Sequence, residues 1–129
     1  MTYLTTCDRL NTVVQSYVQQ LLKGIIEPML LFVINELPAH GYRIIEELNK
    51  RSQGYFEFSA STIYSALRRL ERQGLVLSTW QQVTQKQKRR CYELTEKGRQ
   101  ILTEELNEWQ QFYDAATDIV SPQKTAVTT

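Results

Sequence analysis

Hydrophobic residues in the first third of the chain recur at intervals that suit helices. A first helix is predicted over residues 7–22, ending at Lys23 and Gly24, because apolar side chains follow every three or four residues, at Leu10, Val14, Tyr17, Leu21 and Ile25. Pro28 then fits the first turn of a second helix, where its missing N–H costs least. The segment after it, MLLFVINEL, is apolar on nearly every side, so we expect this helix to form the buried centre of the domain.

A third helix is predicted after the turn signals at residues 38–41. Tyr42, Ile45 and Leu48 fall on one stripe of this helix, which should stop near residues 52–54. The connector that follows, QGYFEF, carries three aromatic residues. We expect these aromatic side chains to cover the core.

The next helix has two distinct faces. Ser59 or Ser61 can cap its start, and Gly74 suits a left-handed residue at its end. One face holds the apolar residues that must turn to the core, namely Ile63, Ala66, Leu67 and Leu70. Rotation by about 100° per residue puts short polar groups and arginines on the opposite face: Ser61, Ser65, Arg68 and Arg72, with Tyr64 and Arg69 at its flanks.

Two strands and a long helix complete the pattern. LVLSTW and RCYELT are rich in β-branched and aromatic residues and flank a polar stretch, which predicts an antiparallel hairpin with a long tip. A last helix starts near Thr95. Its apolar positions have the mean spacing of a coiled-coil seam, about 3.5 residues, and are Leu102, Leu106, Trp109, Tyr113, Ala116 and Val120.

A seam of this length has no evident partner within so small a core, which favours packing against a second copy of the chain. The alternative is that the helix folds back onto its own domain. The first interpretation assigns a dimer interface to residues of both terminal helices: Leu10, Val14, Tyr17, Leu21, Leu102, Leu106, Trp109, Tyr113 and Ala116.

The predicted fold class is therefore mainly α with a small β-hairpin, a winged helix-turn-helix with extra N- and C-terminal dimerisation helices. Residues 1–23 form the N-terminal dimerisation helix and residues 24–94 the winged-helix domain. Residues 95–120 form the C-terminal dimerisation helix, and residues 121–129, which lack periodicity, form a disordered tail.

Charge is strongly segregated, although the net charge is only +1. From Ser59 to Tyr92 there are seven basic residues and one acid, Glu71, whereas residues 93–120 hold seven acids and two bases. A concentrated basic segment beside an acidic one is the electrostatic layout expected of a nucleic-acid-binding surface. The alternative is a winged-helix module that docks an acidic protein without binding DNA.

The helix-turn-helix geometry assigns roles to these residues. Side chains in the first turns of the second helix reach base edges, and neighbouring groups hold the phosphates. Arg68 and Arg69 could bind guanine or phosphate, and the bases of the hairpin tip could reach the backbone or the minor groove. The candidate DNA-binding residues from this pattern are Ser59, Ser61, Thr62, Ser65, Arg68, Arg69, Arg72, Lys86, Lys88, Arg89 and Arg90.

Other classes of protein find little support. Cys7 and Cys91 lack metal-ligand spacing, so we expect no metal, no cofactor and two free thiols; a redox role for Cys91 stays open. His40 is the single histidine, and the chain has no nucleophile elbow, phosphate loop or HExxH motif, so no enzyme is predicted. No apolar run approaches the roughly 20 residues needed to cross a bilayer. We therefore expect a cytoplasmic protein with no membrane contact.

Three segments together resemble the PadR family of transcriptional regulators: GIIEPMLLFVINELPAHGYRIIEELNKRS, STIYSALRRLERQGLV and RRCYELTEKGRQIL. The resemblance covers about residues 24–110. It implies a winged-helix homodimer held by its terminal helices, usually a repressor on a pseudo-palindromic operator. It also implies that Thr62, Tyr64, Arg68 and the wing bases approach DNA, and that Tyr42 lies near the phosphates.

The chain departs from the family pattern in ways that affect base preference. Ala60-Ser61 stands where many members have Pro-Gly, Ser65 replaces a proline, Cys91 replaces a usual tyrosine, and QKQKRR replaces a Gly-Arg wing. The N-terminal extension resembles that of clock-associated members, which implies a circadian clock gene as the target. Trp109 matches a tryptophan that binds flat drugs in multidrug-responsive members, which makes Trp109 a candidate ligand contact for a small-molecule effector.

Overall fold

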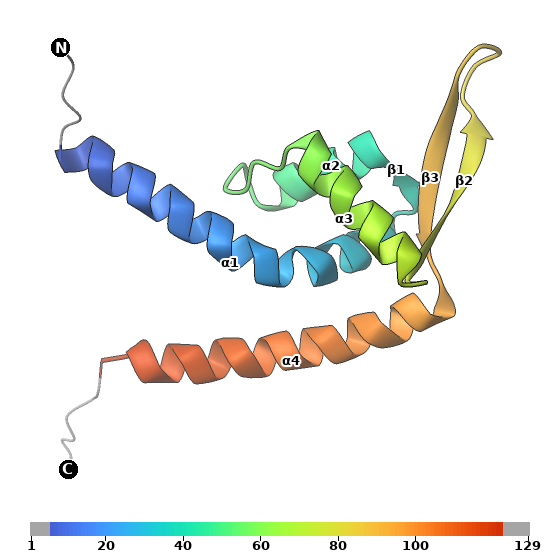
Figure 1. The fold of residues 1–129 in the computed structure, drawn as a ribbon. Helices are drawn as coiled ribbons and strands as arrows, with labels where there is room; N and C mark the ends of the chain where they lie inside the picture. The colour runs from blue at the N-terminus through green and yellow to red at the C-terminus, as the bar shows by residue number, and fades with distance from the viewer. Residues whose placement is uncertain (1–5, 123–129) are drawn as a thin grey trace, which may run out of the picture.

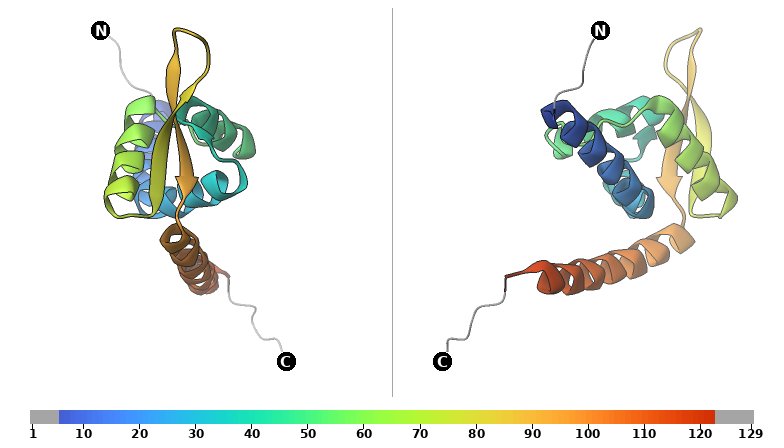
Figure 2. Two further views of the ribbon diagram at one scale, coloured as in Figure 1. Left: turned by 90° about the vertical axis from the view of Figure 1, so that its right-hand side faces the viewer. Right: turned by 60° about the vertical axis from the view of Figure 1, so that its left-hand side comes forward.

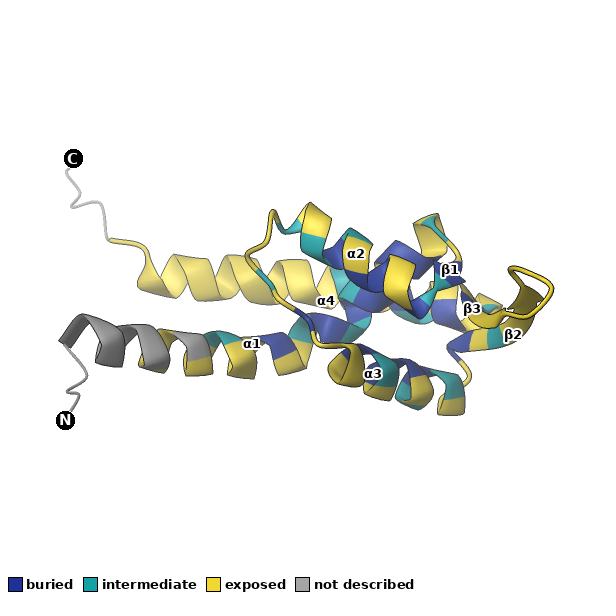
Figure 3. Cartoon of the chain, turned by 90° about the horizontal axis from the view of Figure 1, so that it is seen from above, coloured by how far each residue is buried: buried dark blue, intermediate teal, exposed yellow. Residues whose placement is uncertain are grey.

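The computed structural model describes residues 6–122, with side-chain burial from residue 13 onward except Gln15. Leu10 and Cys7 therefore lie outside the described side chains, and most of the predicted tail, residues 123–129, lies outside the described residues. Helices α2 and α3 and the sheet cluster together, while α1 and α4 extend from them to one side (Figures 1 and 3). The elements are α1 (Thr6–Glu36), β1 (Ala39–His40), α2 (Gly41–Arg51), α3 (Ala60–Arg72), β2 (Val76–Gln82), β3 (Lys88–Leu94) and α4 (Glu96–Val120). The predicted fold class, mainly α with a small β-hairpin in a winged helix-turn-helix, is confirmed, and the dimerisation role of the terminal helices stays a prediction.

The first two predicted helices are one continuous helix, so the predicted break at Lys23 and Gly24 is wrong. Pro28 lies inside α1. It cannot donate to the carbonyl of Gly24, four residues earlier, and its ring disturbs the helix there. Figure 1 shows that α1 changes direction in its middle part, as expected at a proline. Burial of the next turns in the core offsets the lost hydrogen bond, so the helix continues.

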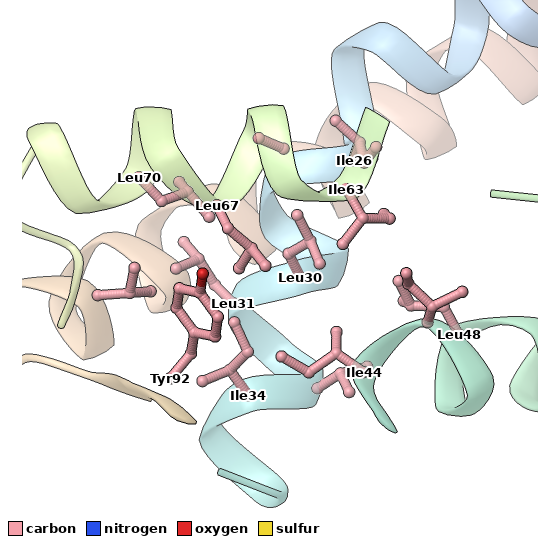
Figure 4. Packing of buried hydrophobic residues seen from close by; sticks show 14 of the residues in the cluster. Ile26, Leu30, Leu31, Ile34, Ile44, Leu48, Ile63, Leu67, Leu70 and Tyr92 are labelled. Carbon is pink, nitrogen blue, oxygen red and sulfur yellow. The ribbon is translucent and has the colours of Figure 1, made fainter. Parts of the chain in front are cut away.

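The second half of α1 is the centre of the core, as predicted. Leu30, Leu31 and Ile34 have no exposed surface. Figure 4 shows them between side chains of α2, α3 and β3, namely Ile44, Leu48, Ile63, Leu67, Leu70 and Tyr92. By length and composition alone, Ser16–Glu36 is long and apolar enough to cross a bilayer, although its apolar residues do not form one uninterrupted run. In the folded chain 39% of its 18-residue apolar window is buried, and the last turns of the segment form the centre of the core.

One residue of the apolar stripe predicted for α2, Tyr42, is exposed rather than buried. Ile45 and Leu48 are buried together with Gly41 and Ile44, but Tyr42 is 61% exposed. The buried stripe is centred near Gly41 and Ile44, and Tyr42 lies about 100° around the helix from Gly41. Tyr42 is therefore available at the surface.

The sheet has three antiparallel strands in the order β1-β3-β2. Strand β1 was not predicted, because two residues are too few to show an alternating pattern. It pairs His40 with Cys91 and Ala39 with Tyr92. The hairpin strands are longer than predicted, since β2 ends at Gln82 and β3 begins at Lys88. Lys88, Arg89 and Arg90 thus belong to a strand, and only Lys86 lies in the tip. Figure 2 shows the hairpin projecting beyond the helices.

Helix α4 starts where predicted and then leaves the core. The Thr95 hydroxyl accepts from the Gly98 N–H at 3.0 Å and donates to the Gly74 carbonyl at 2.6 Å. Leu102 is only 6% exposed and Leu106 is half-buried, so these two proposed dimer contacts pack against the core of their own chain. The seam is exposed from Trp109 onward, and Tyr113 is 58% exposed (Figure 3).

The N-terminal half of α1 carries a similar exposed apolar stripe. Val14, Tyr17 and Leu21 are all more than half exposed, as is the neighbouring Val13. This part of α1 extends beyond the core (Figure 1). Two helices of this chain therefore expose apolar side chains on segments that extend to the same side.

Glu105 lies on the part of α4 that packs against the core, where a charged carboxylate is unfavourable. Its Oε1 atom is shielded from solvent and has no hydrogen-bond partner among the described residues. Burial raises the pKa of Glu105, and the charge of Glu27 on α1 raises it further. The Glu105 carboxyl therefore holds its proton to a higher pH in the folded chain than in the unfolded chain.

We expect Gly98→Ala to lower the free energy of unfolding by about 1–3 kcal/mol. A methyl group there would collide with the Leu75 carbonyl, a backbone atom that cannot move without displacing β2. Thermal unfolding followed by circular dichroism measures the change. Gly24→Ala is the matched control, because a methyl group there meets nothing within 4 Å outside the neighbouring helix backbone. Equal unfolding temperatures for Gly98→Ala and the parent would contradict the tight contact.

We expect Glu105→Gln to stabilise the chain at neutral pH and to have little effect in acid. Because the folded state raises the pKa of Glu105, it binds more protons than the unfolded state just above the ordinary carboxyl pKa. Stability is then lost as pH rises through that window. Urea unfolding at several pH values tests this, with Glu104→Gln, an exposed position on the same helix, as control. A stability difference that does not change with pH would rule the explanation out.

Candidate nucleic-acid interface

Helix α3 presents the faces that its sequence predicted. Ile63, Ala66, Leu67 and Leu70 are buried. The opposite face, with Ser61, Thr62, Ser65, Arg68 and Arg72, is exposed, and Tyr64 and Arg69 are half-buried at its flanks. Gly74 ends the segment with a φ of 76°, a left-handed conformation that suits glycine. The core contacts of α3 thus fix which side chains point outward.

Ser59 is the N-cap, and this role occupies its side chain. Its Oγ accepts from the Thr62 N–H at 3.2 Å and donates to the Thr62 Oγ1 at 2.8 Å. The Thr62 hydroxyl hydrogen is left to donate elsewhere. Of the two proposed caps, Ser59 is therefore the one used, and Ser61 stays exposed on the first turn.

An open cavity of about 390 Å³ lies between the start of α2, helix α3 and the hairpin. We call it the basic cup. It brings together six of the predicted DNA-binding residues, from three different elements, and adds His40, Trp80 and Tyr92. Its lining is His40, Tyr42, Tyr64, Arg68, Trp80, Lys88, Arg89, Arg90 and Tyr92.

Aromatic contacts hold the shape of the basic cup. The rings of Tyr42 and Tyr64 meet edge to face, with centroids 6.1 Å apart. The Arg90 guanidinium lies over the Trp80 ring, 5.4 Å from its centroid. Tyr64 also packs against Gly41, where a methyl group would collide with the tyrosine ring. Trp80 could not be singled out from local sequence patterns, because its partner Arg90 lies on the other strand.

Two tyrosines of the basic cup, Tyr64 and Tyr92, have pKa values raised above the ordinary tyrosine value. Burial raises the pKa of Tyr64, and the nearby Tyr42 adds to this, while Arg89 opposes it. Burial also raises the pKa of Tyr92, against the opposing charges of Arg90 and Arg68. Their hydroxyl groups can therefore donate hydrogen bonds to an anion.

The positive charge of the basic cup is not balanced by acids. The ion pairs of the described residues join Arg43 to Glu46, Arg51 to Glu36 and Glu47, and Arg99 to Glu96, all away from the cup. Glu71, the one acid of this segment, accepts a hydrogen bond from Ser78 instead. The bases of the cup are thus free to attract an anion.

The remaining predicted residues lie beside the basic cup. Ser59, Thr62, Ser65 and Arg69 line a second open cavity of about 650 Å³ between α1 and α3. Lys86 sits in the exposed hairpin turn, which the Gln82 side chain orders by donating to the Thr84 and Gln85 carbonyls. Arg72 lies at the far end of α3. The predicted residues therefore form one surface over α3 and the hairpin, rather than a single cavity.

Within residues that the structure describes, no group of three or more His, Cys, Asp or Glu side chains could hold a metal ion. Cys91 is a half-buried free thiol on β3.

Comparisons with known proteins identify a matching family and similar solved structures. A family model described as the transcriptional regulator PadR-like family matches residues 30–104. A PadR family transcriptional regulator from Eggerthella lenta superposes with a TM-score of 0.79 and 27% identity, covering 89% of this chain and 98% of that one. An uncharacterised protein of Lysinibacillus sphaericus is 28% identical over 89 residues, 69% of this chain and 82% of that protein.

A further solved structure is that of Bacillus subtilis PadR in complex with operator DNA. Its TM-score is 0.57 at 19% identity, and the match covers 81% of this chain and 52% of that one. At 19% identity this likeness shows a shared fold and nothing further.

Proposed function

This chain belongs to the PadR-like family of transcriptional regulators, and from that premise we propose that it binds double-stranded operator DNA as a homodimer. The observation that carries the proposal is the surface formed by α3 and the hairpin, where bases from separate elements gather and form no ion pair with an acid among the described residues. Such a surface attracts the phosphate backbone regardless of sequence. It rests on a winged-helix fold that the DNA-bound Bacillus subtilis protein also has.

Each part of this surface has its own role in the proposal. The first turns of α3 enter the major groove, where Ser61, Thr62 and Ser65 meet base edges and Arg68 binds guanine or phosphate. Arg69 and Arg72 hold the backbone on either side. The basic cup, with Tyr42, Tyr64, Lys88, Arg89 and Arg90, binds phosphates, and Lys86 at the hairpin tip reaches the adjacent backbone or minor groove.

The homodimer is supported by the exposed apolar stripes of α1 and α4. Val14, Tyr17 and Leu21 on α1, and Trp109 and Tyr113 on α4, are exposed in the single chain. Exposed apolar stripes of this kind mark association surfaces, and a twofold axis would use the same stripes on both copies. Residues 1–23 and 95–120 are thus proposed as dimerisation segments, with Ala116 on the same seam and residues 24–94 as the DNA-binding unit.

The finer points of regulation are also proposals. A dimer that covers an operator blocks access to the promoter, which favours repression as the direction of control. A soluble regulator of DNA acts in the cytoplasm. A circadian clock gene as the target stays a prediction from the N-terminal extension alone.

A second candidate function is control by a small-molecule effector. An open, apolar cavity of about 330 Å³ lies between α1, α2 and α4, and Phe32, Phe56, Leu106 and Trp109 are among its lining residues. An aromatic, apolar lining fits a flat hydrophobic ligand. Quenching of tryptophan fluorescence by planar dyes tests this, and loss of the response in Trp109→Leu would identify the site.

The direct test of DNA binding is the selection of duplex fragments from genomic DNA by the purified full-length protein. A regulator should retain one palindromic sequence in preference to others, and its affinity should fall by about 0.9 log unit per log unit of salt for each phosphate contacted. A module that docks acidic proteins would show no sequence preference.

We expect Arg68→Ala to cost about 1–3 kcal/mol of binding free energy and to relax the sequence preference. Lys86→Ala should weaken all sequences alike and lower the salt slope by about 0.9, because it meets backbone only. Fluorescence anisotropy with the selected duplex at several salt concentrations measures both. Arg99→Ala is the control, since Arg99 pairs with Glu96 on α4, away from the surface. An Arg68→Ala variant that binds as the parent does would remove Arg68 from the interface.

We expect Tyr113→Glu to shift the chain from dimer to monomer and to weaken operator binding with it. Tyr113 is exposed in the single chain, so the substitution should leave the fold intact while placing a charge in the apolar seam. Light scattering measures the mass and circular dichroism the fold. Thr103→Glu, an exposed position near the start of the same helix, is the control. A dimeric Tyr113→Glu variant would show that the seam lies elsewhere.

A further inference from the structure

The ring of His40 faces a hydrogen-bond donor at each of its two nitrogen atoms. Nδ1 caps α2 by accepting from the Arg43 N–H at 3.4 Å. Nε2 lies 3.2 Å from a guanidinium nitrogen of Arg89 on β3. The pairing of His40 with Cys91 in the sheet places the His40 backbone beside β3.

A neutral imidazole cannot satisfy both contacts, because only one of its nitrogens accepts while the other carries a proton. If Nδ1 accepts at the helix cap, Nε2 carries the proton and points it at Arg89, which has only donors to offer. If the tautomer is reversed, the Arg43 N–H loses its acceptor. In either state two donors face each other with no acceptor between them.

An anion resolves this arrangement. Two donor nitrogens 3.2 Å apart can each lie about 2.9 Å from one shared oxygen atom. Such an oxygen would sit in the basic cup, which both residues line together with Tyr42, Tyr64 and Arg68. Arg89 is exposed and has no acidic partner among the described residues.

We propose that His40 and Arg89 together bind one phosphate oxygen of the DNA backbone, with the Nε2–H of His40 and the Arg89 guanidinium both donating to it. Nδ1 remains the acceptor that caps α2. His40 thus couples the start of α2 to a phosphate held by the hairpin. This inference rests on the proposed function and adds a contact residue that the basic charge pattern did not reveal.

The test is a double-substitution cycle on the genomic duplex that the parent protein retains. His40→Asn removes the Nε2–H, and asparagine still caps a helix well. Arg89→Gln removes the guanidinium. We expect each variant to bind about tenfold more weakly, as for hydrogen bonds to a charged group, and the double variant to lose much less than the product of the two.

The salt dependence separates the two partners. Arg89→Gln should lower the salt slope by about 0.9, because it removes one charge from a phosphate, whereas His40→Asn should leave the slope nearly unchanged. His40→Asn combined with Lys86→Gln is the control pair. Lys86 lies outside the basic cup, so those two losses should multiply.

A spectroscopic measurement on the parent avoids any effect of the substitutions on folding. His40 is the single histidine of the chain, so its imidazole nitrogen signals are unambiguous in nuclear magnetic resonance. We expect Nδ1 to be the unprotonated nitrogen, and the Nε2–H signal to shift when the duplex is added. A duplex that leaves this signal unchanged, or His40 and Arg89 losses that multiply, would overturn the inference. A parent that retains no duplex would instead overturn the proposed function and the inference with it.

Discussion

Burial of the second half of α1 is the constraint on which the rest of this structure depends. Leu30, Leu31 and Ile34 have no exposed surface, and α2, α3 and β3 all pack against them (Figure 4). Each of these elements has one apolar side, so packing against the same helix also fixes the direction of its polar side. The outward face of α3 and the bases of β3 come to lie on one surface because their inward faces share one core.

That surface combines charge with shape. The basic cup lies where the start of α2, helix α3 and the hairpin meet. Two local contacts maintain its shape. Gly41 leaves room for the Tyr64 ring, and Trp80 holds the Arg90 guanidinium in place. The acids of α4 lie on a helix that leaves from the opposite end of the sheet (Figure 2). In the proposed complex the carboxylates of α4 would therefore lie away from the DNA phosphates.

Local patterns predicted most helices, the two faces of α3 and the hairpin, because periodicity and capping act over a few neighbouring residues. They failed where distant residues decide. Burial of the core carries α1 past Lys23 and Gly24, where local signals predict a stop, and on through Pro28. The two-residue strand β1 exists only because β3 pairs with it. Leu102 looked like part of a seam, but contacts with its own core bury it. His40 and Trp80 escaped notice as site residues because their partners are far along the sequence.

The central claim is that two copies of this surface, related by a twofold axis, bind neighbouring grooves of one DNA duplex. Hydroxyl-radical footprinting of the full-length protein on its selected genomic duplex tests this most directly. The account predicts two symmetry-related protected stretches of backbone with centres about 34–36 Å apart, one helical turn, or a multiple of it. A duplex with no protected stretch, or with a single unsymmetrical one, would contradict it.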